Sequence, residues 1–282
     1  MEITRRSALA GLLAAAGASR ASSGRAAERG LIDGIVWQPD EETANPHGTW
    51  HRLGARQLLV QWTVADDEAF FTGSRLRAAP RQPDWARIGH EPWAQSVILG
   101  LAGRTEEPDA RRDVRALAAL SRRLVAHRWP LHIAGWYFPV EVDPTWPGAT
   151  QLPALLGALP RPLWISAYDN GNIGEEPMAA WLRSWLPGDI GVFFQDGVGL
   201  HTRDPDDARR YADALLKALG PHRFRLIAEA FRPRPGGGFR PAIADEFLPQ
   251  LRAYEGHVVF AFDGPHYLSD SLVEELRRRH RP

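Results

Sequence analysis

Five acidic residues follow or interrupt apolar segments of the sequence, where carboxylates are seldom found. They are Glu141, Asp169, Asp196, Glu229 and Asp263. Burying an unpartnered carboxylate typically costs several kcal/mol, so a chain that places five of them at such positions is expected to use some of them in a site. The three aspartates also stand next to or near glycine, and each could instead shape a turn.

The two glutamates are the stronger catalytic candidates. Glu229 lies among apolar residues with no local turn to make, and Glu141 closes a segment that is aromatic and apolar. Hydrolysis of a glycosidic bond needs one protonated and one ionised carboxyl group on either side of the bond. We therefore predict Glu141 and Glu229 as a catalytic pair that projects into one cleft from opposite walls. A separation of about 5–5.5 Å would retain the anomeric configuration, and about 6.5–9.5 Å would invert it.

Aromatic and amide side chains near the same strand ends could bind a carbohydrate. Flat apolar rings stack on sugar faces, while polar neighbours bind hydroxyl groups. The predicted substrate-binding residues are Trp37, Gln38, Gln61, Trp62, Trp136, Tyr137, Tyr168, Asp169, Asn170, Gln195, Asp196, Asp263 and His266. The alternative for the tryptophans is that they fill the core.

Eight apolar segments are the elements that would position these residues. They are Leu31–Pro39, Gln57–Val64, Ser96–Gly103, Leu131–Val142, Pro162–Asp169, Ile190–Val198, Leu226–Phe231 and Val258–Phe262. Most are continuously apolar, as is typical of parallel strands that are covered on both faces. Segments of helical period lie between them, and eight strand–helix repeats in this length predict a single (β/α)8 TIM barrel over residues 28–282.

Loop lengths indicate which end of the barrel carries the site. Segments that leave strands, such as 40–48, 64–91 and 232–240, are longer and more polar than segments that enter them. Active sites of such barrels are built from the loops at the ends of the strands. The Gly236–Gly238 run is expected to form a flexible lid or loop tip rather than a phosphate-binding loop.

Composition and the N-terminal segment restrict the function further. The 34 basic and 34 acidic residues balance, which argues against a nucleic-acid or anionic-membrane partner. The absence of cysteine excludes disulfides and thiolate chemistry, and no histidine motif predicts a metal or another cofactor. Residues 1–27 carry the Arg5-Arg6 pair before a short apolar run, which predicts a cleavable twin-arginine-type signal peptide; an ordinary secretion signal is the alternative. We expect a periplasmic or secreted protein without a membrane anchor.

Three motifs carry a family resemblance over nearly all of the expected mature chain. Gly135-Trp136-Tyr137 with Glu141, the string Gln195-Asp196-Gly197-Val198-Gly199, and Glu229-Ala230-Phe231 resemble a group of poorly characterised bacterial glycosidase-like barrel proteins, catalogued as a domain of unknown function. The placement is also similar to a large clan of retaining glycosidases. That resemblance implies an acid/base at Glu141 and a nucleophile at Glu229. The clan usually has Asn before the acid/base, where this chain has Val140.

Two functions remain after these considerations. The leading hypothesis is an exported glycoside hydrolase that cleaves a polysaccharide or oligosaccharide by a two-carboxylate mechanism. The alternative is a non-catalytic carbohydrate-binding barrel that assists polysaccharide export or assembly, and Val140 is the feature that favours it.

Overall fold

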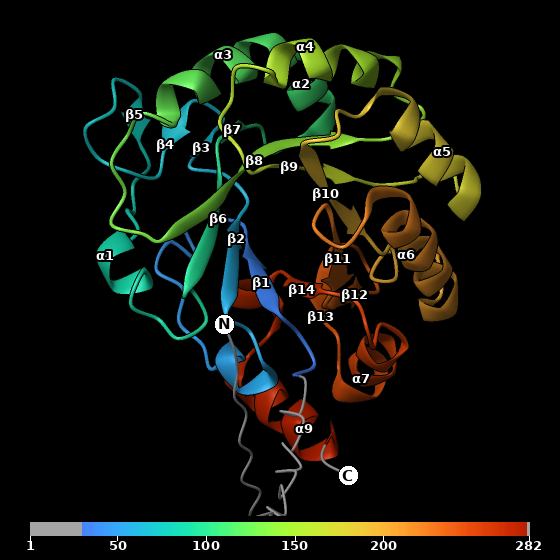
Figure 1. Cartoon of the computed structure of the whole chain (residues 1–282). Coiled ribbons are helices and arrows are strands. Elements are labelled where there is room, and N and C mark those ends of the chain that lie inside the picture. Colours follow the sequence, from blue (N-terminus) through green and yellow to red (C-terminus); the bar gives the residue numbers. More distant parts are fainter. Residues whose placement is uncertain (1–29, 281–282) are drawn as a thin grey trace, which may run out of the picture.

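The computed structural model describes residues 30–280, so the expected signal peptide lies outside the described residues. Eight parallel strands form a closed barrel surrounded by helices (Figure 1). In chain order these strands are β1 (Gly34–Trp37), β2 (Gln57–Val60), β6 (Ser96–Gly100), β8 (Ile133–Val142), β9 (Leu163–Ala167), β10 (Ile190–Gln195), β11 (Phe224–Glu229) and β14 (Val259–Phe262). Each of the eight predicted segments contains or overlaps one of these strands, and the predicted TIM barrel is confirmed.

The barrel interior is filled by one apolar side chain from each strand. These eight side chains are Val36, Leu59, Ile98, Tyr137, Trp164, Phe193, Ile227 and Phe260. Alternate residues on the strands face outward and pack against the helices in a separate, larger core. Since the middle of the barrel is packed, a ligand can reach the strands only at the two ends.

The helices form an outer ring around the strands in Figure 1. They are α1 (Trp85–Ile88), α2 (Glu107–Arg112), α3 (Val114–Leu124), α4 (Leu152–Leu156), α5 (Glu175–Trp185), α6 (Pro205–Leu219), α7 (Ala244–Ala253), α8 (Gly264–Tyr267) and α9 (Asp270–His280), with the 3-10 turns η1 (Trp50–Leu53) and η2 (Pro147–Gln151). The start of α6 follows from its sequence, because the Asp204 side chain accepts a hydrogen bond from the Asp207 amide and Pro205 opens the first turn.

Two small sheets decorate the end of the barrel at which the strands finish. One is a four-stranded sheet made of β3 (Val64–Ala65), β4 (Glu68–Ala69), β5 (Arg77–Ala78) and β7 (Ala102–Gly103). Three of these strands lie in the long segment between β2 and β6. Strands β12 (Phe231–Pro233) and β13 (Phe239–Pro241) form an antiparallel hairpin. Its turn contains the three glycines Gly236–Gly238, all with positive φ, so this segment is the tip of a hairpin.

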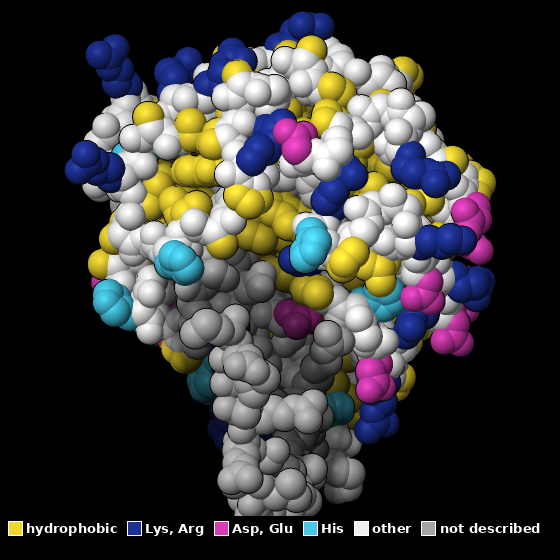
Figure 2. Space-filling view, in the orientation of Figure 1, with side chains coloured by type: hydrophobic (Ala, Val, Ile, Leu, Met, Phe, Trp, Pro, Cys, Tyr) yellow, Lys and Arg dark blue, Asp and Glu magenta, His cyan; other side chains and the backbone are white. Residues whose placement is uncertain are grey.

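Neither sign of charge covers the face drawn in Figure 2, where basic and acidic side chains both appear and apolar side chains gather towards the middle. Among the residues that the structure describes, no helix combines the length and the apolar character needed to cross a membrane.

Candidate active site

A cavity of about 210 Å³ lies at the end of the barrel where the strands finish, and we call it the mouth cavity. It is lined by Gln38, Gln61, Trp62, Arg104, Thr105, Glu107, Tyr137, Pro139, Glu141, Ser166, Gln195, Ile227 and Phe262. Six of these residues were predicted from the sequence, namely Gln38, Gln61, Trp62, Tyr137, Glu141 and Gln195. Gln38, Gln61, Glu141 and Gln195 point into the barrel at the level above the apolar layer, Tyr137 belongs to that layer, and Trp62 follows the end of β2.

Glu141 is the carboxyl group that combines burial with access to this cavity. It follows Tyr137 and Pro139 on β8, where the register with β9 shifts between Phe138 and Val142, and all three side chains line the cavity. Burial raises the pKa of Glu141 to about 7, although a hydrogen bond donated by Gln195 Nε2 to Glu141 Oε2 and the charge of Arg111 work in the opposite direction. A carboxyl group with this pKa can both donate and accept a proton near neutral pH.

Glu107 is a second carboxyl group in the mouth cavity, and the sequence did not reveal it. It is the first residue of α2, and its Oε1 atom accepts a hydrogen bond of 3.0 Å from the Glu141 backbone amide. Burial and the nearby Glu141 charge raise the pKa of Glu107 to about 8, while Arg111, 3.2 Å from Oε1, lowers it. Two acidic groups thus share one cavity wall.

Glu229 faces into the barrel but does not line the mouth cavity. It stands two residues beyond Ile227 on β11, and strands β9 and β10 separate β11 from β8. Its side chain is only 2% exposed, because the segment after β10 lies over it. Its Oε2 atom accepts hydrogen bonds from the amides of Gly199 (2.7 Å) and Leu200 (3.3 Å). Burial, followed by the charge of Asp196, raises the pKa of Glu229 to about 8.

Asp196 points away from the cavity. It follows Gln195, whose side chain enters the cavity, so the alternation of a strand turns Asp196 outward beneath α7. There its Oδ2 atom accepts hydrogen bonds from Tyr254 Oη (2.7 Å) and Gln250 Nε2 (2.5 Å), and the residue has no exposed surface. These contacts tie β10 to α7, and the described geometry gives Asp196 no route to a sugar in the mouth cavity.

The three predicted tryptophans differ in whether they reach the mouth cavity. Trp62 lines the mouth cavity and donates its indole N–H to the Pro39 carbonyl oxygen at 3.0 Å. Trp37 is fully buried against Trp85, with ring centroids 5.4 Å apart, and it lies in the outer core. Trp136 also packs against the outer core. The core alternative therefore describes Trp37 and Trp136, whereas Trp62 belongs to the same outer core and also lines the mouth cavity, where stacking on a sugar stays a prediction.

The predicted residues at the end of β9 lie outside the mouth cavity. Tyr168 is 7% exposed, and its hydroxyl group is 2.7 Å from Thr202 Oγ1. Asp169 is fully buried and accepts a 2.7 Å hydrogen bond from the Tyr211 hydroxyl. Asn170 is exposed at the surface. Asp169 Oδ2 also accepts a hydrogen bond from the Ile173 amide, so its contacts fix the loop that follows β9. This is the turn-shaping role given above as the alternative for Asp169.

A second cavity, of about 280 Å³, borders the first and is called here the aromatic cavity. It is lined by Gln38, Asp40, Phe231, Phe239, Phe262, Asp263, His266 and Tyr267. The predicted residues Asp263 and His266 lie here, so the sequence-predicted site is spread over two neighbouring cavities that share Gln38 and Phe262.

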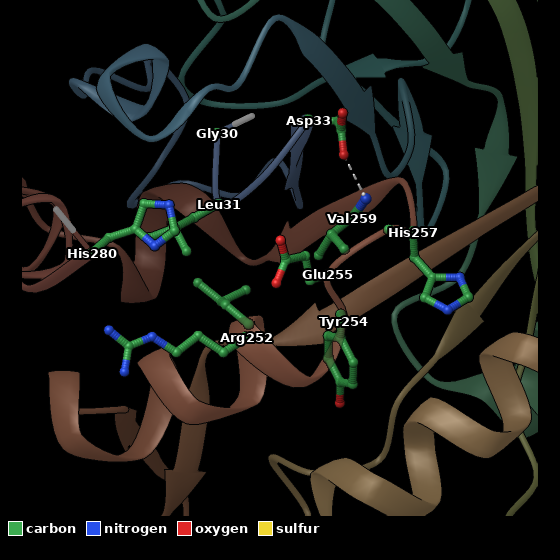
Figure 3. Close-up of a pocket in the computed structure, with 11 residues that line it drawn as sticks. Gly30, Leu31, Asp33, Arg252, Tyr254, Glu255, His257, Val259 and His280 are labelled. Atoms are coloured by element: carbon green, nitrogen blue, oxygen red, sulfur yellow. Dashed lines mark hydrogen bonds between the residues drawn. The ribbon is translucent and has the colours of Figure 1, made fainter. Parts of the chain in front are cut away.

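Another cavity, of about 300 Å³, lies at the opposite end of the barrel (Figure 3). Asp33, just before β1, and Val259, at the start of β14, are among its lining residues, and the Asp33 carboxylate accepts a 2.9 Å hydrogen bond from the Val259 amide. This cavity lies at the end of the barrel where the strands begin, and residues at that end usually contribute to stability rather than to catalysis.

Comparison with solved structures places this architecture among known folds. A crystal structure from Bacteroides thetaiotaomicron, named "putative alpha-L-fucosidase", superposes with a TM-score of 0.63 at 16% sequence identity, covering 89% of this chain and 95% of the other. The chain therefore shares the barrel fold of that structure. The PgaB (BpsB) glycoside hydrolase domain from Bordetella bronchiseptica gives a TM-score of 0.43 at 14% identity, covering 87% of this chain and 98% of the other. No family model and no curated protein matches the sequence.

Proposed function

We propose that this protein is a glycoside hydrolase in which Glu141 is the general acid. The observation that carries the proposal is the position of Glu141 in the mouth cavity with its pKa raised to about 7 by burial. Such a group is protonated when the bond breaks and is ionised afterwards at neutral pH, as acid/base catalysis requires. The amides of Gln38, Gln61 and Gln195 supply donors and acceptors for sugar hydroxyl groups.

Glu229 would be the second catalytic carboxyl group. The two backbone amides at its Oε2 atom favour the ionised form that a nucleophile or general base needs, whereas burial and the charge of Asp196 outweigh them and raise its pKa to about 8. The segment that carries Gly199 and Leu200 would have to move for a substrate to reach this carboxylate. Glu107 is the competing candidate for the same role, because it already lines the mouth cavity beside Glu141.

The non-catalytic carbohydrate-binding function is the second candidate. The burial of Glu229 favours it, since a binding barrel needs no second carboxylate in contact with the sugar. Val140, at the position where Asn is usual in the retaining clan, supports the same alternative.

Release of sugar from a substrate panel tests these functions. The panel holds aryl glycosides of common sugars in both anomeric forms, including α-L-fucosides, together with soluble polysaccharides, and the readouts are released aryl alcohol and new reducing ends. The variants are Glu141→Gln, Glu229→Gln and Glu107→Gln. Glu176→Gln, at an exposed position in the first turn of α5, is the matched control.

We expect wild type and Glu176→Gln to cleave one substrate at equal rates. Glu141→Gln should lose at least a hundredfold in kcat, the usual contribution of a general acid. Loss in Glu229→Gln with retention in Glu107→Gln identifies Glu229 as the second group, and the reverse identifies Glu107. Carbohydrate binding without product from any substrate would reject the hydrolase and leave the binding barrel.

A further inference from the structure

We infer that the aromatic cavity is a second sugar subsite, so that the substrate is an oligosaccharide extending across both cavities rather than a single sugar on a simple leaving group. This inference rests on the proposed carbohydrate function and specifies its substrate class. The two cavities share Gln38 and Phe262 as lining residues, so a chain of sugars can pass from one to the other at these side chains.

One half of the aromatic cavity is apolar. Phe231 lies between Phe239, with centroids 4.7 Å apart, and Tyr267, with centroids 5.4 Å apart, and Phe262 completes the group. Phe239 is 42% exposed although it is a large apolar residue, and it sits on the β12–β13 hairpin. A sugar ring presents an axial C–H face of the kind that packs against such rings.

The other half is polar, and most of its atoms are already engaged. His266 lies between two carboxylates, with Nε2 2.8 Å from Asp40 Oδ2 and Nδ1 3.1 Å from Asp263 Oδ2. Asp40 Oδ1 accepts hydrogen bonds from the amides of Glu42 and Thr43 and from the Thr43 hydroxyl group. His266 and Asp40 therefore build the wall and leave little capacity for a ligand.

Asp263 retains an acceptor that has no partner. The residue is 1% exposed, and its Oδ2 atom accepts hydrogen bonds from the Gln38 amide (2.7 Å) and from His266. Its Oδ1 atom has no hydrogen-bond partner among the described residues. Leaving a buried acceptor unsatisfied is unfavourable, so a hydroxyl donor that reaches Oδ1 would be bound favourably.

The charge and polarity of the wall argue against other ligand classes. The lining has two carboxyl groups and a single histidine, so it offers no net positive charge to hold an anion. A wholly apolar ligand would cover Gln38 and Asp263 without giving them a hydrogen bond, which costs free energy. A neutral sugar matches both halves, because it combines a C–H face with hydroxyl donors.

Binding as a function of chain length tests the inference apart from hydrolysis. The inactive variant Glu141→Gln is titrated by calorimetry with oligosaccharides of one to six units from cellulose, xylan, galactan and chitin, and the titrations are repeated with Phe239→Ala added. Ile173→Ala is the matched control, because Ile173 is 41% exposed and lines neither cavity. Wild-type cleavage of the same sugars and of aryl monoglycosides is measured in parallel.

We expect one series to bind more tightly as it lengthens, and Phe239→Ala to raise Kd for the longer members by roughly tenfold, as the loss of an aromatic contact predicts. The monomer and the Ile173→Ala control should be unaffected. Equal Kd values with and without Phe239, or no binding by any sugar, overturn the inference. If monoglycosides are cleaved but affinity does not rise with chain length, the hydrolase proposal stands and the second subsite is rejected. If binding depends on Phe239 but no sugar is cleaved, the subsite stands and the hydrolase proposal is rejected.

Discussion

Replacing Gln195 by leucine should raise the pKa of Glu141, because the Gln195 amide donates a hydrogen bond to its carboxylate and thereby favours the ionised form. A hydrogen bond to a charged group contributes about 1.5–3 kcal/mol, and about 1.36 kcal/mol corresponds to one pH unit. Glu141 lines a cavity that water can enter, so water replaces part of the lost bond. The titration midpoint should therefore move up by about one pH unit.

Carbon-13 NMR of protein labelled at glutamate carboxyl groups measures this midpoint directly, and the spectrum of Glu141→Gln assigns the signal. Wild-type Glu141 should titrate near the pKa of about 7. Activity should follow the same group with a defined sign: a general acid must be protonated, so the rate falls as the pH rises through about 7, and in Gln195→Leu it falls at higher pH. Gln151→Leu, on η2 and outside the mouth cavity, is the control.

An unchanged or lower midpoint in Gln195→Leu would refute the reasoning, since it would mean that Gln195 does not stabilise the ionised carboxylate. If the NMR midpoint shifts in Gln195→Leu but the alkaline limb of the kcat/KM profile does not, Glu141 is not the group that transfers the proton.

Three further predictions concern stability. The pKa of Glu229 is raised from 4.5 to about 8, so the folded state holds its proton more tightly and the stability contributed by this group is lost as the pH rises between these values; Glu229→Gln should flatten the decline of Tm from pH 5 to 9. Gly199→Ala would place a Cβ atom 2.7 Å from Glu229 Cβ and should cost about 1–3 kcal/mol in urea unfolding. Gly188→Ala, which meets nothing within 4 Å, should cost much less. Tyr254→Phe removes a 2.7 Å hydrogen bond from buried Asp196 and should cost about 1–3 kcal/mol in the same assay, whereas an unchanged midpoint would show that this bond adds nothing.

The barrel could be predicted because its signal repeats along the chain. Parallel strands are covered on both faces, so most of these segments are continuously apolar. The helical stripe of α6, with Asp204 as its cap, is also visible in the sequence. Strand alternation could also have sorted some site residues. Trp136 is one residue from Tyr137, and Asp196 is one residue from Gln195, so neither member of a pair can share its neighbour's face.

Other features of the site depend on packing between distant segments. Glu107 reaches the mouth cavity from the start of a helix, so its position at no strand end gives no sign of the site in the sequence. Glu229 has the inward parity expected of it, but the close approach of Gly199 covers it, and the sequence gives no measure of that approach. The aromatic cavity likewise needs the β12–β13 hairpin to bring Phe239 beside Phe231.

Gly30 and His280, at the two ends of the described chain, line the same cavity at the strand-entry end of the barrel. A linker joined at either position would therefore leave the molecule on the side away from the mouth and aromatic cavities. Immobilising the protein on a resin or sensor chip through a side chain placed at position 30 or 280 would turn both cavities towards the solution, where long glycans could reach them.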